Sequence, residues 1–166
     1  NGVVNLFMVF QPGAGWRHVY IRTHRCKEDV AHVIKDLVDE QFPQAEELKI
    51  VMDNLNTHTP ASLYEVFLPE EARRLAAKLD IHYTPKHASW LDMAEIEISV
   101  LKQQCFDRRI PTEELLAQEI TAWEAPRNQR QATVEWRFTS QDARSKLKRL
   151  YPILEQAEKA EVTCQN

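Results

Sequence analysis

Two strand-like runs joined by a tight turn open the sequence and limit its fold more than any other feature. Residues 3–10 are mostly apolar and rich in β-branched and aromatic side chains. In residues 16–23 every second side chain belongs to one set and the side chains between them to another, as expected for the two faces of a strand. Proline and glycine at positions 12, 13 and 15 supply turn chemistry between the runs. The pattern predicts an antiparallel β-hairpin whose first strand already belongs to a core.

Helical and strand patterns alternate after this hairpin. Apolar residues spaced three and four apart from Val30 to Val38 predict a helix that Pro43 ends. Short apolar runs predict a buried strand at residues 48–52 and another strand at residues 81–83. Further helices are expected to begin near Thr59, Pro69 and Leu91. Thr112 is expected to cap another helix, which runs through Trp123 and is followed by a polar linker at residues 126–131. This order predicts an α/β fold with a mixed sheet that carries helices on both faces.

Composition narrows the class of protein. The chain has 166 residues, of which 43% are hydrophobic, enough for one domain with a real core. It contains no apolar stretch near the ~20 residues that a membrane crossing needs, and no signal peptide opens it. Three distant cysteines without a CxxC pair favour neither a disulfide framework nor a zinc site. A reducing cytoplasm is the expected location.

The net charge of −4 conceals a basic segment near the C-terminus. Between Arg127 and Leu150, seven basic residues stand against two acidic ones, so this segment carries +5 and the rest of the chain −9. A solvated basic helix and a surface for DNA phosphates both fit this pattern. We expect residues 1–125 to form the core, and residues 126–166 to form a basic extension that packs on it and frays at its end.

Asp53 is the first candidate catalytic residue. It follows the strand at residues 48–52, and functional groups of open α/β sheets gather beyond the C-terminal ends of strands. The alternative role for such an aspartate is a turn former or cap. Three polar residues, Asn54, Asn56 and His58, follow closely, which favours a functional site.

The helix expected over residues 91–106 carries the second candidate. At about 100° per residue, one apolar face contains Leu91, Ala94, Ile98, Leu101 and Cys105. Glu95 falls in a narrow polar wedge, shared with Asp92, Ser99 and Lys102. Glu97 falls between Met93 and Leu101, so a helix edge or a salt bridge is expected for it. Glu95 is therefore the better catalytic candidate of the two glutamates. The alternative is that Glu95 is a neighbour of Lys102 on an ordinary solvent-exposed stripe of the helix.

Two carboxylates held by rigid elements suit magnesium. This hard cation accepts a few carboxylate oxygens and keeps water and phosphate ligands. A pair of such ions about 3.5–4 Å apart can activate a water and stabilise the leaving oxygen of a phosphodiester. That chemistry needs no nucleophilic side chain, and the sequence contains no serine elbow, Walker loop or GxGxxG motif. The two acids thus predict metal-dependent phosphodiester chemistry.

Two longer motifs contain these acids. Residues 51–58 (VMDNLNTH) and 82–95 (HYTPKHASWLDMAE) resemble the DDE transposases of bacterial insertion sequences related to the mariner group. The likeness continues through residues 105–111 (CFDRRIP) and 147–152 (LKRLYP). The resemblance implies a ribonuclease-H-like fold. It also implies that Asp53 is the family's second acid, at the end of the fourth strand, and that Glu95 is the third, on the helix after the fifth strand.

The sequence departs from the family pattern in three ways. Forty-one residues separate the two acids, a longer spacer than in many mariner relatives. The family usually has asparagine where this chain has Asp92, a carboxylate that either competes for the metal or caps the helix. No aspartate precedes Asn5, so the first acid, its strand and a DNA-binding helix-turn-helix region are expected upstream of Asn1. We therefore expect a truncated catalytic domain that carries two of three acids and is inactive alone.

The resemblance implies cleavage of transposon DNA ends and joining of the freed 3′-hydroxyl to target DNA, with two Mg²⁺ or Mn²⁺ ions held by the acids. DNA is the implied partner, a homodimer the implied assembly of the full-length protein, and the nucleoid of a bacterial cytoplasm the implied location. Lys86, His87, Lys102 and the basic segment from Arg127 are the predicted phosphate contacts, with plain solvation as the alternative.

Two other functions stay open from the sequence. The chain could be the product of a decayed element that binds DNA or a partner transposase without cutting. It could also be another ribonuclease-H-like nuclease, acting on RNA–DNA hybrids or junctions.

Overall fold

The computed structural model describes residues 3–53, 60–85 and 91–146 of the chain. The chain divides into two compact units, Asn1–Val134 and Glu135–Asn166. The first unit holds every strand and all but one of the described helices, and the second holds the short helix α6 (Ser140–Lys146). The candidate acids Asp53 and Glu95 both belong to the first unit.

The opening hairpin is confirmed. Strands β1 (Asn5–Gln11) and β2 (Trp16–Arg22) pair antiparallel, with Asn5 opposite Arg22 and Gln11 opposite Trp16. Gly15 ends the turn with a φ of 61°, a left-handed conformation that glycine adopts without a Cβ penalty.

A second strand pair lies beyond the first helices. Strands β3 (Leu48–Met52) and β4 (Leu79–Tyr83) run parallel, with Leu48 opposite Leu79 and Met52 opposite Tyr83. The backbone N–H of Thr84 donates to the carbonyl of Met52 at 2.9 Å, which extends the pairing past the strand ends. The C-terminal ends of β3 and β4 therefore meet at one edge.

The predicted α/β composition is confirmed, and the single mixed sheet is not confirmed. Among the described residues, β1 pairs with β2 and β3 with β4, which gives two separate two-stranded sheets in place of one mixed sheet. A continuous ribonuclease-H-like sheet stays a prediction.

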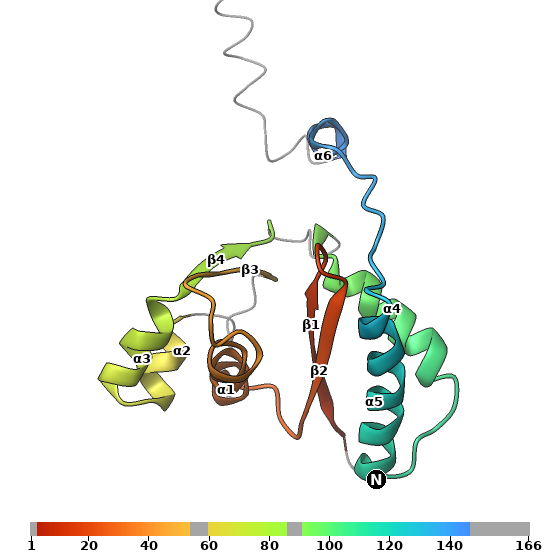
Figure 1. The fold of residues 1–166 in the computed structure, drawn as a ribbon, viewed down its shortest axis with the longest axis horizontal. Helices are drawn as coiled ribbons and strands as arrows, with labels where there is room; N and C mark the ends of the chain where they lie inside the picture. Colours follow the sequence, from red (N-terminus) through yellow and green to blue (C-terminus); the bar gives the residue numbers. More distant parts are fainter. Residues whose placement is uncertain (1–2, 54–59, 86–90, 147–166) are drawn as a thin grey trace, which may run out of the picture. The chain divides into compact units, whose positions relative to one another are not determined.

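The two faces of the hairpin pack against different helices (Figure 1). Strand side chains alternate between the faces. Phe7 and Tyr20 contact clusters built on α1 (Lys27–Asp36) and the π-helical turn η1 (Leu37–Gln41). Met8 and Val19 contact a cluster built on α4 (Ala94–Cys105) and α5 (Glu113–Gln129). The predicted placement of helices on both faces therefore holds at the hairpin.

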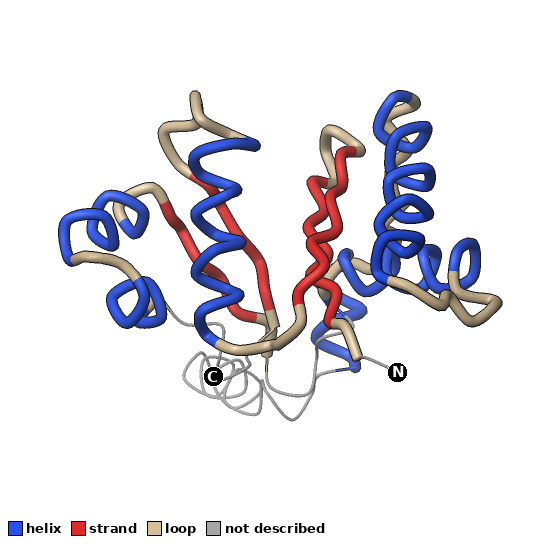
Figure 2. The backbone as a smooth tube through the Cα atoms, turned by 90° about the horizontal axis from the view of Figure 1, so that it is seen from below, coloured by secondary structure: helices blue, strands red, loops and turns tan. Residues whose placement is uncertain are grey.

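Helices cover one face of the β3–β4 pair. Leu48 and Leu79 pack on a cluster formed by α1, α2 (Ala61–Val66) and α3 (Pro69–Ala76), and Figure 2 shows α1 running alongside these strands. On β3, Lys49 and Val51 are exposed. The predicted strand at residues 48–52 is confirmed, but its predicted burial is wrong, because its alternate side chains face solvent.

Helix α5 extends beyond its predicted end at Trp123. It includes Pro126 and ends at Gln129, so the predicted division of the chain after residue 125 falls inside this helix. Its last turn is held on β2: the Asn128 side chain accepts from the Arg17 N–H at 2.9 Å and donates to the Arg17 carbonyl at 2.8 Å. That the C-terminal extension as a whole packs on the core stays a prediction.

Gly15 lies where the hairpin turn meets the chain that follows α5. A Cβ at Gly15 would lie 2.3 Å from the backbone carbon and oxygen of Gln131, whereas a Cβ at Gly13 would have no neighbour within 4 Å. Gly15→Ala is therefore expected to lower the free energy of unfolding by about 2–4 kcal/mol, from the positive φ and from overpacking. Gly13→Ala, the matched control, should change it by less than about 0.5 kcal/mol. Urea denaturation checks both, and equal stability of the two variants would contradict the packing.

Candidate functional site

Asp53 lies immediately after β3, as the sequence predicts. The short strand positions it: β3 is fixed by its pairing with β4 and by the packing of Leu48, and the Thr84 hydrogen bond holds the residue before it. The Oδ1 atom of Asp53 is buried although the residue as a whole is half-buried. A rigid strand end thus carries this carboxylate.

Asp92 lies just before α4 and within electrostatic range of Asp53. Its Oδ1 accepts a hydrogen bond from the Ala94 N–H at 2.9 Å and so caps the first turn of the helix. Burial raises the pKa of Asp92, the Ala94 hydrogen bond opposes this rise, and the negative charge of Asp53 adds to it. The pKa effect means that the carboxylate of Asp53 is within electrostatic reach of the residue that opens α4.

Glu95 is exposed in the first turn of α4. Two members of its predicted polar wedge, Ser99 and Lys102, are exposed with it, and the Ser99 hydroxyl donates to the Glu95 carbonyl at 2.9 Å. In residues 3–53, 60–85 and 91–146, no group of three or more His, Cys, Asp or Glu side chains is arranged to hold a metal ion. That Asp53 and Glu95 together bind metal stays a prediction.

The predicted apolar face of α4 is confirmed at Leu101 and Cys105 and is wrong at Ile98. Ile98, expected in the core, is 42% exposed, whereas Glu97 is 0% exposed. The buried residues of α4 are Glu97, Leu101 and Cys105, which recur every four positions. The helix is rotated toward Glu97 because this carboxylate has two cationic partners inside the protein.

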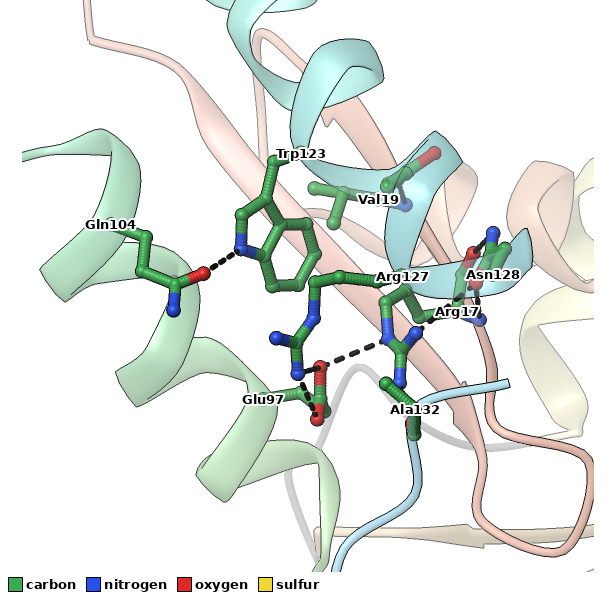
Figure 3. A network of polar contacts seen from close by, with 9 residues as sticks. Arg17, Val19, Glu97, Gln104, Trp123, Arg127, Asn128 and Ala132 are labelled. Atoms are coloured by element: carbon green, nitrogen blue, oxygen red, sulfur yellow. Dashed lines mark hydrogen bonds and ion pairs between the residues drawn. The ribbon is translucent and has the colours of Figure 1, made fainter. Parts of the chain in front are cut away.

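Those partners form the Glu97 cluster, defined as Arg17, Glu97 and Arg127 (Figure 3). Arg17 Nε lies 3.0 Å from Glu97 Oε2, and Arg127 Nη2 lies 3.1 Å from Oε1 and 3.2 Å from Oε2. Arg17 is fully buried, and burial lowers its pKa while the charge of Glu97 opposes that change. The salt bridge expected as one role of Glu97 is present, with two arginines.

Further contacts fix both arginines. Arg17 donates to the carbonyl of Ala132, and its Nη1 lies 3.3 Å from Asn128 Oδ1. The Arg127 guanidinium stacks 5.0 Å from the ring centroid of Trp123, whose indole N–H donates to Gln104 at 2.8 Å. The Glu97 cluster therefore joins β2, α4 and α5.

The residues predicted to contact DNA phosphates differ in their exposure and in their contacts within the protein. Lys86 and His87 lie outside the described residues. Lys102 is exposed on α4, and its role stays a prediction. Arg127, the first residue of the predicted basic segment, is mostly buried and paired with Glu97, so its expected role as a phosphate contact is wrong.

A pocket of about 490 Å³ lies where β2 leads into α1. Its lining residues carry charges of both signs: Arg22, His24, Cys26, Glu28, Asp29, His32 and Asp36. Several of them are partnered inside the protein, since Arg22 lies 3.2 Å from Asp36 and the Cys26 thiol donates to Asp29 at 2.9 Å. No motif or periodic pattern in the sequence marks this pocket.

The comparisons with known proteins agree with the two acidic motifs. The family model described as DDE superfamily endonuclease matches residues 1–117, a span that contains Asp53, Asp92 and Glu95. No curated protein and no solved structure matches the chain. None of the helices in the described part of the chain combines the length with the apolar composition that a bilayer crossing requires. By the family match over most of its length, this chain belongs to the DDE superfamily of endonucleases.

Proposed function

We propose that this protein is a transposase that cuts the DNA ends of its own mobile element and joins the freed 3′-hydroxyl to target DNA. The family match carries the proposal, because it spans both motifs that hold the candidate acids. The local geometry supports it: Asp53 follows a fixed strand end, and its charge acts on the residue that opens the helix of Glu95. Asp53 and Glu95 are then the catalytic acids.

The acids fit a divalent cation by their chemistry. Carboxylate oxygens are the ligands that Mg²⁺ and Mn²⁺ prefer. Burial is the main cause of the raised pKa of Asp92, and the negative charge of Asp53 adds to it, so two carboxyl groups lie within electrostatic range of each other beside α4. Asp53 and Glu95 would hold the ions, which supply an activated water and stabilisation of the leaving oxygen. Asp92 keeps its Oδ1 on the Ala94 N–H, so helix capping is its proposed main role.

The remaining parts of the proposal concern DNA. Lys102 lies two turns after Glu95 on α4 and is exposed, which suits a contact to the phosphate beside the scissile bond. Lys86 and His87 are proposed for the same role. A homodimer on paired ends of a bacterial insertion sequence, at the nucleoid, is the assembly that the family resemblance favours.

DNA cleavage by the full-length protein tests this function. The substrates are a duplex with the terminal sequences that flank the gene, a scrambled duplex of equal length, and an RNA–DNA hybrid. We expect cleavage of the end duplex with Mg²⁺ or Mn²⁺, its loss in EDTA and its return when Mg²⁺ is restored in excess.

The other functions give distinct results in the same assay. Faster cleavage of the hybrid than of the end duplex would identify a nuclease of RNA–DNA hybrids instead. Tight binding of the end duplex without cleavage in either metal would identify a non-catalytic DNA-binding protein.

A further inference from the structure

The first turn of α4 has one buried side chain close to Glu95. The buried residues of this helix are Glu97, Leu101 and Cys105, so the first apolar anchor, Leu101, comes more than one turn after Glu95. Glu97 is two residues away from Glu95 and is 0% exposed. The orientation of the turn that carries Glu95 therefore depends on what holds Glu97.

We propose that Glu97 is a positioning residue, and that the Glu97 cluster sets the rotation of α4 so that Glu95 faces the metal and the DNA. This inference rests on the proposed function, in which Glu95 binds the cation. It goes beyond that function because it assigns a role to three charged residues that the proposed function does not use.

Helix geometry links the two glutamates. Residues two positions apart point about 200° away from each other around an α-helix. When Glu97 points into the protein, Glu95 must point outward, as its exposure shows. A rotation of the first turn that released Glu97 would also turn Glu95 away from its present direction.

Two cations from two different elements make this orientation rigid. Arg17 comes from β2 and Arg127 from α5, and they contact the carboxylate at 3.0–3.2 Å. A single ion pair would let the carboxylate swing about its partner, whereas two fixed partners define its position. Arg17 is fully buried and Arg127 is mostly buried, so salt and water screen the two pairs weakly.

Glu97→Gln removes the charge and keeps the shape. The amide NH₂ of glutamine faces guanidinium donors, so it repels at least one of the two arginines. We expect the affinity of the full-length protein for Mn²⁺ to fall roughly tenfold, the lower end of what loss of support around a metal ligand costs. Isothermal titration with Mn²⁺ measures this directly, without relying on cleavage.

Glu124→Gln is the matched control. Glu124 is also a buried glutamate of the same unit: it lies on α5, accepts from the Val19 N–H of β2 and lies 3.1 Å from His18 Nδ1. Glu124 lies neither on α4, which carries Glu95, nor next to β3, which Asp53 follows in the chain. A loss of melting temperature without a loss of Mn²⁺ affinity is expected for Glu124→Gln, which separates a positioning role from a general loss of stability.

The reference variant Glu95→Gln separates failure of this inference from failure of the proposed function. If the wild type binds Mn²⁺ and Glu95→Gln weakens binding, the metal site stands. Wild-type affinity in Glu97→Gln would then overturn the positioning role alone, as would an equal loss of affinity in Glu124→Gln. If Glu95→Gln binds Mn²⁺ like the wild type, the proposed site and the positioning role both fail.

Arg127→Lys serves if Glu97→Gln does not fold. Lysine keeps the positive charge and loses the guanidinium group, whose Nη2 contacts both carboxylate oxygens and whose plane stacks on Trp123. A fall in Mn²⁺ affinity of about threefold is expected, smaller than in Glu97→Gln because Arg17 remains in place. Unchanged affinity in a folded Arg127→Lys protein would overturn the inference.

Discussion

Asp53→Asn and Glu95→Gln are each expected to reduce metal-dependent DNA cleavage on the order of a thousandfold, about 4 kcal/mol of barrier. Both changes keep the size of the side chain and replace a carboxylate by a neutral amide, which is a poor ligand for a hard divalent cation. Cleavage of the end duplex by the full-length protein under single-turnover conditions gives the rate. Transposition of the complete element in cells provides a second, independent measurement.

Two controls accompany this prediction: the stability of the Glu95→Gln variant, and the cleavage rate of a variant in another exposed glutamate. Glu95 is exposed, so Glu95→Gln should change the free energy of unfolding by less than about 0.5 kcal/mol. Glu40→Gln alters an exposed glutamate on η1 and should leave the cleavage rate at the wild-type level. Wild-type cleavage in either Asp53→Asn or Glu95→Gln would exclude that residue from the catalytic acids.

The strand before Asp53 could be predicted because its signal is local. A short apolar run bounded by polar residues leaves little choice for residues 48–52, and a carboxylate directly after such a run must lie at the strand end. The hairpin was predictable for the same reason, since turn residues and alternation are adjacent in sequence. Local patterns thus place Asp53 correctly along the chain.

The orientation of α4 could not be predicted from a helical wheel. A wheel ranks side chains by hydrophobicity and turns Ile98 inward, but the burial of Glu97 depends on Arg17 and Arg127. Arg17 reads as an ordinary alternating residue of a strand, and it lies 80 positions before Glu97. A buried ion pair between distant segments leaves no periodic signal in the sequence.

The arrangement of the strands could not be predicted either, because it also depends on contacts between distant segments. A link between the β1–β2 pair and the β3–β4 pair, direct or through another strand, joins segments far apart in the chain, and alternation within each strand does not encode its neighbour. The length of α5 was missed because Pro126 reads as a helix stop. The helix continues past Pro126 to Gln129, and the hydrogen bonds of Asn128 with Arg17 hold this last turn.

Glu97→Leu is expected to lower the free energy of unfolding by about 3–5 kcal/mol, the cost of removing one partner of a buried ion pair. Leucine fits the buried position by size, but it leaves the guanidinium groups of Arg17 and Arg127 without an anion. Arg17 is fully buried and has no direct route to water. Thermal unfolding of the protein should show a fall in Tm of roughly 6–20 °C.

Removing the two cations as well should recover stability, which tests the electrostatic origin of the loss. When a buried ion cluster is replaced as a whole by apolar side chains, the change is often neutral or favourable, because no charge remains to be desolvated. We therefore expect the triple variant Arg17→Leu, Glu97→Leu, Arg127→Leu to be more stable than Glu97→Leu alone. Residues in contact do not contribute additively, so the comparison of single and triple variants measures their coupling. A triple variant less stable than Glu97→Leu would show that the arginines stabilise the fold mainly through Asn128, Ala132 and Trp123, and would contradict the electrostatic origin of the loss.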